Sequence, residues 1–345
     1  MIISLIFINS PFIFIHRFVI MIYSFEQCQK FFNHAFHEQA FGKSPENLYH
    51  PVQYILSSGG KRLRPVLMIM AYNMFDDEIS HAIYPAMAIE IFHNFTLVHD
   101  DIMDESPIRR NQPTVHKKWN ANTAILSGDA MSILAYSYLV KLTHPRLEDI
   151  IRLFNKTALQ VCEGQQYDMD FEHIHHVSEA SYLNMIKLKT AVLIACSLKM
   201  GAIIANASPE DAERIYDFGI DIGMAFQLQD DLLDTYGNET SFGKSIGNDI
   251  KMNKKTYLLI KALELSNDNQ RMELQNAFQG KRHDGDAKIK KVIDIYDSLG
   301  IQEKTAKKIS DCFQHAHGMI NNIKAEADRK TELEKLISNL EHRSH

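Results

Sequence analysis

The sequence predicts an all-α protein, and two observations support this prediction. Turn-forming residues are few, since the chain of 345 residues contains only 15 Gly and 9 Pro. Apolar residues recur at spacings of three and four along segments 88–104 and 218–234, whereas the strict alternation typical of β-strands is rare. Because 45% of the residues are hydrophobic, the chain can bury a sizeable core between such helices.

The N-terminal segment 1–20 is apolar but is typical of neither a membrane span nor a signal peptide. Asn9 and Pro11 interrupt it before it reaches roughly 20 clean apolar residues, and it lacks a basic start. We interpret it as a non-native or disordered extension, with translation beginning at Met21, and we expect no stable membrane span. No Pro/Gly/Ser-rich linker divides the rest, so residues 21–345 are predicted to form a single domain.

Helix boundaries are predicted at four polar segments, which are 57–60 (SSGG), 143–146 (THPR), 206–211 (NASPED) and 236–249 (YGNETSFGKSIGND). Ser208 followed by Pro209 is typical of a helix start, because proline suits the first turn. In the C-terminal tail, apolar residues at helical spacing predict a packing face formed by Leu333, Leu336, Ile337 and Leu340.

Charge and cysteine content limit the classes of function. The net charge of −6 argues against nonspecific nucleic-acid binding, and we expect no nucleic-acid partner. The four cysteines lie far apart without metal-binding spacing, so they are interpreted as free thiols of a reducing, cytoplasmic compartment.

Both long apolar segments end in the pattern Asp-Asp-x-x-Asp. The aspartates are Asp100, Asp101 and Asp104 in the first and Asp230, Asp231 and Asp234 in the second. On a helix the first and last of each set point the same way, where like charges repel. One such cluster could be a solvated face. Two clusters on apolar helices favour Mg²⁺ held against a diphosphate, because Mg²⁺ uses one or two carboxylates plus phosphate oxygens.

Basic residues suited to a polyanion lie near these clusters. Lys61, Arg62 and Arg64 follow a Gly pair, and Arg109 and Arg110 follow the first cluster. Each motif alone is also compatible with a solvated turn or a surface salt bridge. His93 lies two turns before Asp100, where it is either a core residue or a phosphate donor. Together these residues indicate diphosphate chemistry on an apolar substrate, in which cations stabilise the leaving group and an apolar pocket excludes water.

Seven blocks occur between about residues 50 and 260 in an order that resembles the trans-isoprenyl diphosphate synthases of the polyprenyl synthetase family. They read GGKRLRP, HNFTLVHDDIMD, RRNQPT, GQQYDMDFE, KLKTAVL, FQLQDDLLD and FGKSIGNDIKMNKKTYL. The resemblance implies an isoprenoid synthase fold with ten or more helices around a central cavity, usually in a homodimer. It implies head-to-tail condensation of isopentenyl diphosphate with an allylic diphosphate (dimethylallyl, geranyl or farnesyl), using Mg²⁺.

The resemblance also assigns expected roles to residues of this chain. The two aspartate sets would bind Mg²⁺ on opposite sides of the allylic diphosphate. The isopentenyl diphosphate would be held by Lys61, Arg64, His93 and Arg110. The allylic diphosphate would be surrounded by Arg109, Lys189, Thr190, Gln227, Lys244 and Lys254. Of these, Lys189, Thr190 and Gln227 would also stabilise the allyl cation. Asn111 and Asn248 stand where the family commonly has Gly.

Product length is expected to depend on the residues just before the first aspartate pair. In the family the residue at the place of Phe95 often forms the floor of the chain tunnel, and Thr96 follows it. An aromatic residue there, with no insertion between Asp101 and Asp104, resembles synthases of geranylgeranyl diphosphate, with farnesyl diphosphate the next expectation. A plain core aromatic remains the alternative for Phe95.

Three other functions are less compatible with the sequence. A non-catalytic regulatory subunit usually loses aspartates from one cluster, and this chain keeps both sets. A terpene cyclase of the same fold would not need the set Lys61, Arg64 and His93. A metal-dependent phosphohydrolase would use His/Asp motifs, and the one metal-like segment, EHIHH at 172–176, is more typical of a surface loop.

Overall fold

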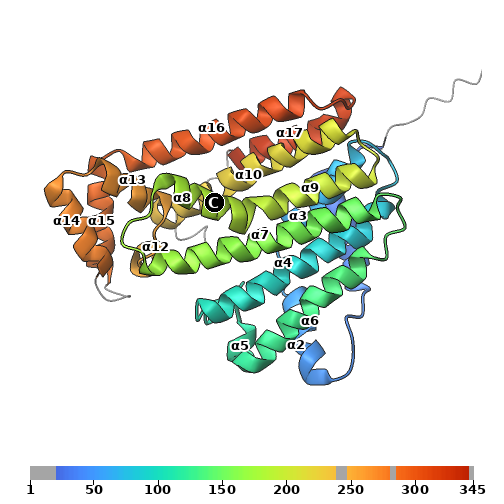
Figure 1. Cartoon of the computed structure of the whole chain (residues 1–345), viewed down its shortest axis with the longest axis horizontal. Helices are drawn as coiled ribbons and strands as arrows, with labels where there is room; N and C mark the ends of the chain where they lie inside the picture. The colour runs from blue at the N-terminus through green and yellow to red at the C-terminus, as the bar shows by residue number, and fades with distance from the viewer. Residues whose placement is uncertain (1–20, 238–246, 280–284, 342–345) are drawn as a thin grey trace, which may run out of the picture.

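A computed structural model describes residues 21–237, 247–279 and 285–341, and it confirms the all-α prediction (Figure 1). The N-terminal half contains α1 (Phe25–His37), α2 (Glu46–Ser57), α3 (Leu63–Asn73), the 3-10 turn η1 (Ile79–Ala82), α4 (Ile83–Met103), β1 (Ile108–Arg109), β2 (Gln112–Pro113), α5 (Val115–Lys118), α6 (Ala121–Leu139) and α7 (Leu147–His173). The C-terminal half contains α8 (Glu179–Ile186), the π-helical turn η2 (Lys187–Ala191), α9 (Val192–Ile204), α10 (Pro209–Tyr236), α12 (Asn248–Lys251), α13 (Tyr257–Leu265), α14 (Asp268–Gln279), α15 (Asp286–Ser298), α16 (Ile301–Asn321) and α17 (Ala327–Glu341).

The long helices lie side by side around the centre of the molecule. In Figure 1, α7, α9, α10 and α16 run along the long axis, with α3 and α4 beside them. The most extensive packing joins α4 to α6, α10 to α16, α3 to α9 and α9 to α10. Helices α14 and α15 lie at one end of the molecule (Figure 1). This arrangement brings α4 and α10, which carry the two aspartate sets, to the same central region.

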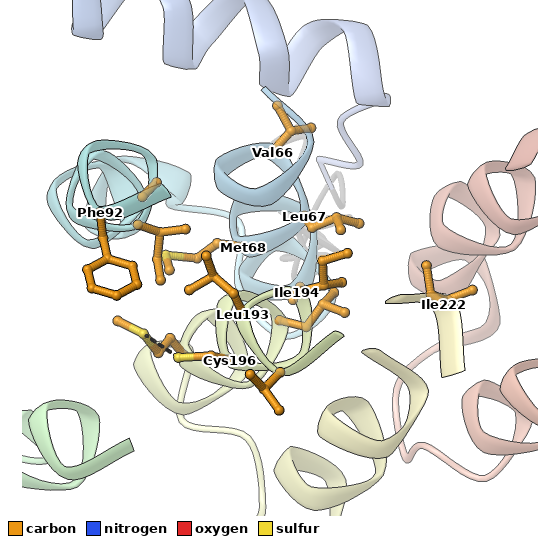
Figure 2. Close-up of a cluster of buried hydrophobic side chains, with 14 of the residues drawn as sticks. Val66, Leu67, Met68, Phe92, Leu193, Ile194, Cys196 and Ile222 are labelled. Atoms are coloured by element: carbon orange, nitrogen blue, oxygen red, sulfur yellow. Dashed lines mark hydrogen bonds between the residues drawn. The ribbon is translucent and has the colours of Figure 1, made fainter. Parts of the chain in front are cut away.

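The main core lies where α3, α4, α9 and α10 converge. Figure 2 shows Met68 of α3, Phe92 of α4, Leu193 of α9 and Ile222 of α10 pointing toward this region. All four side chains are buried. Burying a side chain of this size stabilises a fold by roughly 1.5–3 kcal/mol. This core therefore fixes the helices that form the walls of the site.

Glycines on α10 allow it to approach η2 and α9 closely. A Cβ at Gly223 would lie 2.4 Å from the Cα of Ala191, and one at Gly219 would lie 2.5 Å from the Cα of Ala195. Such distances are shorter than van der Waals contact, so only glycine permits this packing. The close approach sets Gln227, one turn after Gly223, beside Thr190 of η2.

The predicted helix boundaries agree with the structure in the residues that it describes. The side chain of Ser208 accepts a hydrogen bond from the Asp211 amide at 3.1 Å, and Pro209 is the first residue of α10. Segments 57–60 and 143–146 lie between α2 and α3 and between α6 and α7. Much of 236–249 lies outside the described residues.

One short element was not predicted from the sequence, the antiparallel pair β1–β2. Ile108 pairs with Pro113 and Arg109 with Gln112. The two residues between the strands, Arg110 and Asn111, have φ of +51° and +60°. Such angles are typical of a two-residue hairpin turn, and Asn tolerates them better than most residues. Asn111 can therefore stand where the related sequences commonly have Gly.

The C-terminal part adds a second core and the wall formed by α17. The second core is formed by buried residues of α12, α13, α14 and α15 and by Ile301 of α16, and Leu232 packs against both cores. On α17, Leu333 and Ile337 are buried, whereas Leu336 and Leu340 line the central cavity. The predicted apolar face of the tail thus contributes two residues to the core and two residues to the wall of the cavity.

Within the described residues, no helix is both long and apolar enough to cross a membrane. The segment 1–20, interpreted above as an extension, lies outside the described residues. The division into an extension and a single domain stays a prediction.

Candidate active site

The central cavity of about 640 Å³ contains most of the site residues predicted from the sequence. Its walls include Lys61, Arg64, His93, Thr96, Asp100, Asp104, Arg109, Arg110, Lys189, Thr190, Gln227, Asp230 and Lys254. A cavity of about 120 Å³ shares Lys189, Thr190, Gln227 and Lys254 with it. Segments separated by up to two hundred residues are thus brought together. Lys244 lies outside the described residues.

The first acidic wall is formed by the C-terminal end of α4. Asp100 and Asp104 line the cavity, whereas Asp101 is 1% exposed and points away from it. Asp101 accepts hydrogen bonds from Nε of Arg109 at 2.8 and 2.9 Å and pairs with its Nη2 at 2.7 Å. Burial raises the pKa of Asp100 despite the opposing charge of Lys189, and Asp104 adds repulsion. This wall therefore presents two crowded carboxylates, while the third orients an arginine.

The second acidic wall is formed by α10. Asp230 lines the main cavity and Asp231 the smaller one. Burial, together with the charge of Asp249, raises the pKa of Asp231 to about 8, against hydrogen bonds from Tyr182 and Gln227. Asp234 is 8% exposed and accepts a hydrogen bond from the Asp249 amide at 2.8 Å. Asp230 is therefore the member of this set that faces the main cavity.

The cationic wall is formed by the loop before α3, by α4 and by the β1–β2 turn. Nη1 of Arg64 lies 3.1 Å from Nε2 of His93. Burial lowers the pKa of Arg64 to about 10, and burial and the charge of Arg64 hold the pKa of His93 well below its usual range. Arg110 donates hydrogen bonds to the carbonyl oxygen of Gly59 and to Ser58 Oγ. This wall thus combines arginine cations with a neutral imidazole.

One polar atom of the cationic wall is available to donate a hydrogen bond to a ligand. Nε of Arg64 is buried and has no hydrogen-bond partner among the described residues. Buried donors are normally satisfied, and an arginine fork is well suited to phosphate oxygens. Arg62 also lines the cavity but differs, because its guanidinium forms a buried ion pair with Glu90 at 2.5 Å. A buried carboxylate thus compensates the charge of Arg62, and a role of this residue in binding phosphate stays a prediction.

The third wall is the π-helical turn η2. Thr190 Oγ1 donates a hydrogen bond to Gln227 Oε1 at 3.0 Å, and Lys189 Nζ lies 2.6 Å from Asp168 Oδ2. A π turn inserts an extra residue into a helix and often occurs at functional sites. Here it widens the chain beside Gly164 of α7, where a Cβ would lie 2.3 Å from the Lys189 amide nitrogen. The turn thereby directs Lys189 and Thr190 into the cavity.

Comparison with known proteins identifies the family. The family model for the polyprenyl synthetases matches residues 45–297. The chain belongs to the polyprenyl synthetase family. It is a prenyltransferase.

Individual relatives agree with this assignment. The geranylgeranyl diphosphate synthase of Methanosarcina mazei is 42% identical over 222 residues, which cover 64% of this chain and 68% of the relative. The geranylfarnesyl diphosphate synthase of Natronomonas pharaonis is 37% identical over 249 residues, covering 67% and 73%. A crystal structure of a geranylgeranyl pyrophosphate synthase has 41% identity and a TM-score of 0.90, covering 94% of this chain and all of that one. The isoprenoid synthase fold expected from the sequence is confirmed.

The prenyltransferase has a further cavity of about 260 Å³ between α4 and α7. It shares Thr96, Asp100, Val161 and Lys189 with the central cavity, and its other lining residues include Phe95, His99, Met103 and Cys162. Phe95 packs edge-on against His99, with ring centroids 4.9 Å apart, and against Phe92 at 5.4 Å. Thr96 therefore lies nearer the aspartates, as helix geometry predicts, while Phe95 lies at the aromatic far side.

Sequence reasoning assigned no role to several polar residues of this prenyltransferase. Asp168 and Asp249 line the smaller cavity with Asp231 and Lys254. Burial lowers the pKa of Lys254, but the charges of Asp249, Asp104 and Asp168 outweigh burial and raise it overall. Both aspartates lie in blocks quoted above, GQQYDMDFE and FGKSIGNDIKMNKKTYL. The sequence therefore contained these residues in recognised blocks, but it could not show that they lie beside Asp231 and Lys254.

The His-rich segment 172–176 lies at the surface, around the end of α7. Among the described residues, no three Asp, Glu, His or Cys side chains are gathered closely enough to hold a metal ion by themselves. Asp100 and Asp104 of α4 and Asp230 of α10 instead line one cavity. This arrangement is compatible with Mg²⁺, which commonly completes its shell with substrate phosphate oxygens and water.

Proposed function

We propose that this prenyltransferase condenses isopentenyl diphosphate head to tail with an allylic diphosphate (dimethylallyl, geranyl or farnesyl), giving a short-chain all-trans prenyl diphosphate. One observation carries the proposal. Asp100 and Asp104 of α4 and Asp230 of α10 line a single cavity that also has a separate wall of cations. Two diphosphates can be held there by different means, one by carboxylates with a metal and one by arginine and lysine. The names of the relatives support a short-chain product.

The residues that would hold Mg²⁺ supply carboxylate oxygens, and the negative charges of these carboxylates repel one another unless a cation compensates them. Burial and the neighbouring Asp104 disfavour the charged form of Asp100. Mg²⁺ held by Asp100, Asp104 and Asp230 would neutralise the negative charge that develops on the departing diphosphate. Arg109, Lys189 and Lys254 add positive charge on the same side of the cavity. Arg109 is held in place for this task by Asp101.

The second diphosphate, that of isopentenyl diphosphate, fits the cationic wall. Lys61, Arg64 and Arg110 supply positive charge, and Nε of Arg64, which has no partner in the described part of the chain, supplies a donor. His93 stays neutral because burial and the surrounding arginines lower its pKa, so it can donate one hydrogen bond without adding charge. The wall binds a diphosphate without needing a metal ion.

The allyl cation would form between these two walls. Thr190 and Gln227 line the cavity and are joined by a hydrogen bond, and the partial negative charge of their oxygens would stabilise positive charge there. Apolar side chains, including Val161, Leu193 and Leu340, help to exclude water from it. The isopentenyl double bond attacks the cation, and the departing diphosphate accepts the proton that is lost. No side chain acts as a nucleophile.

The deciding assay incubates the purified protein with isopentenyl diphosphate, each allylic primer and Mg²⁺, then sizes the dephosphorylated alcohols. We expect turnover that Asp104→Asn reduces by about 100-fold or more, because a carboxylate that stabilises leaving-group charge is lost. Glu148→Gln, which removes an exposed carboxylate on α7, is the matched control and keeps full activity. Absence of any product from folded protein with every primer would refute the proposed function.

We infer that geranylgeranyl diphosphate is the main product and farnesyl diphosphate the next. The growing chain would extend from Asp100 past Thr96 into the 260 Å³ cavity, where Phe95 and His99 form an aromatic barrier and Phe92 packs behind Phe95. A barrier at this depth favours a short product. The same sizing assay measures it.

We propose that the enzyme is a homodimer formed through α6 and α7. Apolar side chains on these helices are exposed to an unusual degree, with Leu126 at 61%, Ile133 at 67% and Leu159 at 67%. Apolar surface of this kind commonly marks a protein interface. Light scattering should give twice the chain mass for the wild type, and Ile133→Asp with Leu159→Asp should give a monomer. A monomeric wild type would refute the proposal.

We also propose a cytoplasmic location. All four cysteines are free thiols, which is typical of a reducing compartment. Burial raises the pKa of Cys28 and Cys196 to about 12, so these two are also unreactive. Fractionation with an antibody to the chain tests the location, and recovery in a membrane or secreted fraction would contradict it.

A further inference from the structure

Arg62 is a cation in the motif GGKRLRP that lines the central cavity, but its charge is compensated by a buried carboxylate. Its Nη1 donates to Glu90 Oε1 at 2.5 Å, and its Nη2 donates to the carbonyl oxygen of Leu56 at 2.7 Å. The guanidinium also lies 5.2 Å from the ring centroid of Phe36. The side chains of Arg62 and Glu90 are 2% and 3% exposed. At the edge of the cavity, Arg62 is thus held by Glu90 and by the Leu56 carbonyl oxygen.

Glu90 connects this pair to the substrate-binding face of α4. Its Oε1 also accepts a hydrogen bond from Asn94 Nδ2 at 2.9 Å. Glu90 lies one turn before His93, whose Nε2 is 3.1 Å from Arg64. Two contacts therefore join the start of α3 to α4, namely Arg62 with Glu90 and Arg64 with His93.

The backbone around Arg62 needs such an anchor. Arg62 has φ of +51°, and Gly59 and Gly60 before it have φ of +78° and +121°. A left-handed conformation is uncommon for a residue with a side chain, so surrounding contacts must hold it. The loop is otherwise tied by side chains, with Gln29 donating to the Lys61 carbonyl and Arg110 donating to the Gly59 carbonyl.

We propose that Arg62 and Glu90 are positioning residues whose buried ion pair sets the loop that presents Lys61 and Arg64 to isopentenyl diphosphate. The inference rests on the proposed function and extends it. Lys61 precedes Arg62 directly and Arg64 follows two residues later, so a shift of Arg62 displaces both. On the allylic side of the cavity, Lys189, Thr190 and Gln227 lie on η2 and α10, whereas Arg62 directly precedes α3 and Glu90 lies on α4.

Two variants keep the charges of the Arg62–Glu90 pair but change its geometry. They therefore test whether the geometry of the pair, and not its charge alone, is needed for substrate binding. Arg62→Lys cannot contact Glu90 and the Leu56 carbonyl together, because an ammonium lacks the planar fork. Glu90→Asp keeps the carboxylate but shortens its reach. Each variant is expected to raise KM for isopentenyl diphosphate roughly tenfold, the equivalent of one charge-assisted hydrogen bond to phosphate, with KM for the allylic substrate unchanged.

Arg214→Lys is the matched control. Arg214 pairs with the buried Asp211 at 2.8 Å near the start of α10, and it lines none of the three cavities described above. This variant is expected to lower the melting temperature and leave both KM values unchanged. Equal rises in both KM values for Arg62→Lys and Glu90→Asp, or a lower melting temperature with neither KM changed, would overturn the proposal.

Binding of isopentenyl diphosphate alone, measured by calorimetry without metal, keeps the two proposals distinguishable. Wild type that binds but does not turn over would refute the proposed function only. Wild type and Arg62→Lys that bind equally well would refute the positioning role only. Failure of both variants to fold would assign the pair to stability and would also overturn the inference.

Discussion

Replacing Gly164 with alanine is expected to reduce turnover strongly, because this position has no room for a side-chain atom. The new Cβ would lie 2.3 Å from the Lys189 amide nitrogen and 2.7 Å from the Leu188 carbonyl carbon and the Lys189 Cα. All three are backbone atoms of the π turn, so no side-chain rotation can relieve the overlap. Ordinary contact begins near 3.4 Å, and η2 or α7 must move by roughly 1 Å.

The expected magnitudes follow from this displacement. A misplacement of about 1 Å at a catalytic group can reduce turnover by about 100-fold. Overpacking costs about 1–3 kcal/mol of stability, while exchanging Gly for Ala in a helix contributes up to about 1 kcal/mol in return. The net loss of stability is therefore about 1 kcal/mol, which is too small to account for the expected loss of activity. Lys189 and Thr190 are displaced, whereas the cationic wall is not.

Steady-state kinetics and thermal unfolding of the same samples test this prediction. We expect Gly164→Ala to lower kcat about 100-fold, with KM for isopentenyl diphosphate little changed. Gly318→Ala on α16 is the matched control, since among the described residues no atom outside the adjoining helix backbone lies within 4 Å of its added Cβ, and it should be active and slightly more stable. Wild-type kcat in a folded Gly164→Ala protein would refute the argument that η2 needs this glycine.

Three further predictions concern single side chains of the site. Phe95→Ala should lengthen the product by opening the aromatic barrier, and an unchanged alcohol size on thin-layer analysis would exclude Phe95 as the stop. Asp101→Asn should lower stability by about 2 kcal/mol and raise KM for the allylic substrate, since Arg109 loses its charged partner; calorimetry and kinetics measure both. In metal-free protein, the raised pKa of Asp231 means that the folded state keeps a proton that the unfolded state loses. Stability should therefore fall as pH rises from 3.8 to about 8, and Asp231→Asn should weaken this fall in denaturant titrations; an identical pH dependence would contradict it.

The helical fold and much of the site could be predicted because the signals are local. Apolar spacing identified the helices, and the four-residue spacing of Asp100 and Asp104 placed both on one face, with Asp101 to the side. The structure shows this arrangement. Helix geometry alone also placed Thr96 closer than Phe95 to the aspartate face, and the cavity lining agrees.

Other features depend on contacts that no local pattern specifies. The segment KLKTAV reads as ordinary helix, and its π turn packs against Gly164, which lies more than twenty residues earlier. The burial of Arg62 depends on Glu90, which lies 28 residues later. The sequence therefore could not show which of the cations Lys61, Arg62 and Arg64 is paired with a buried carboxylate.

The sequence by itself determined the helices, the two acidic clusters and the chemistry that they favour, because residue spacing on a helix fixes which side chains share a face. Only the tertiary structure decided which members of each charged set face the cavity. It placed Asp230 at the cavity and bound Asp234 to the Asp249 amide. It paired Arg62 with Glu90 and left Nε of Arg64 without a hydrogen-bond partner among the described residues. The physical reason is that burial of a charge requires a partner, and the partners come from helices that are distant in sequence.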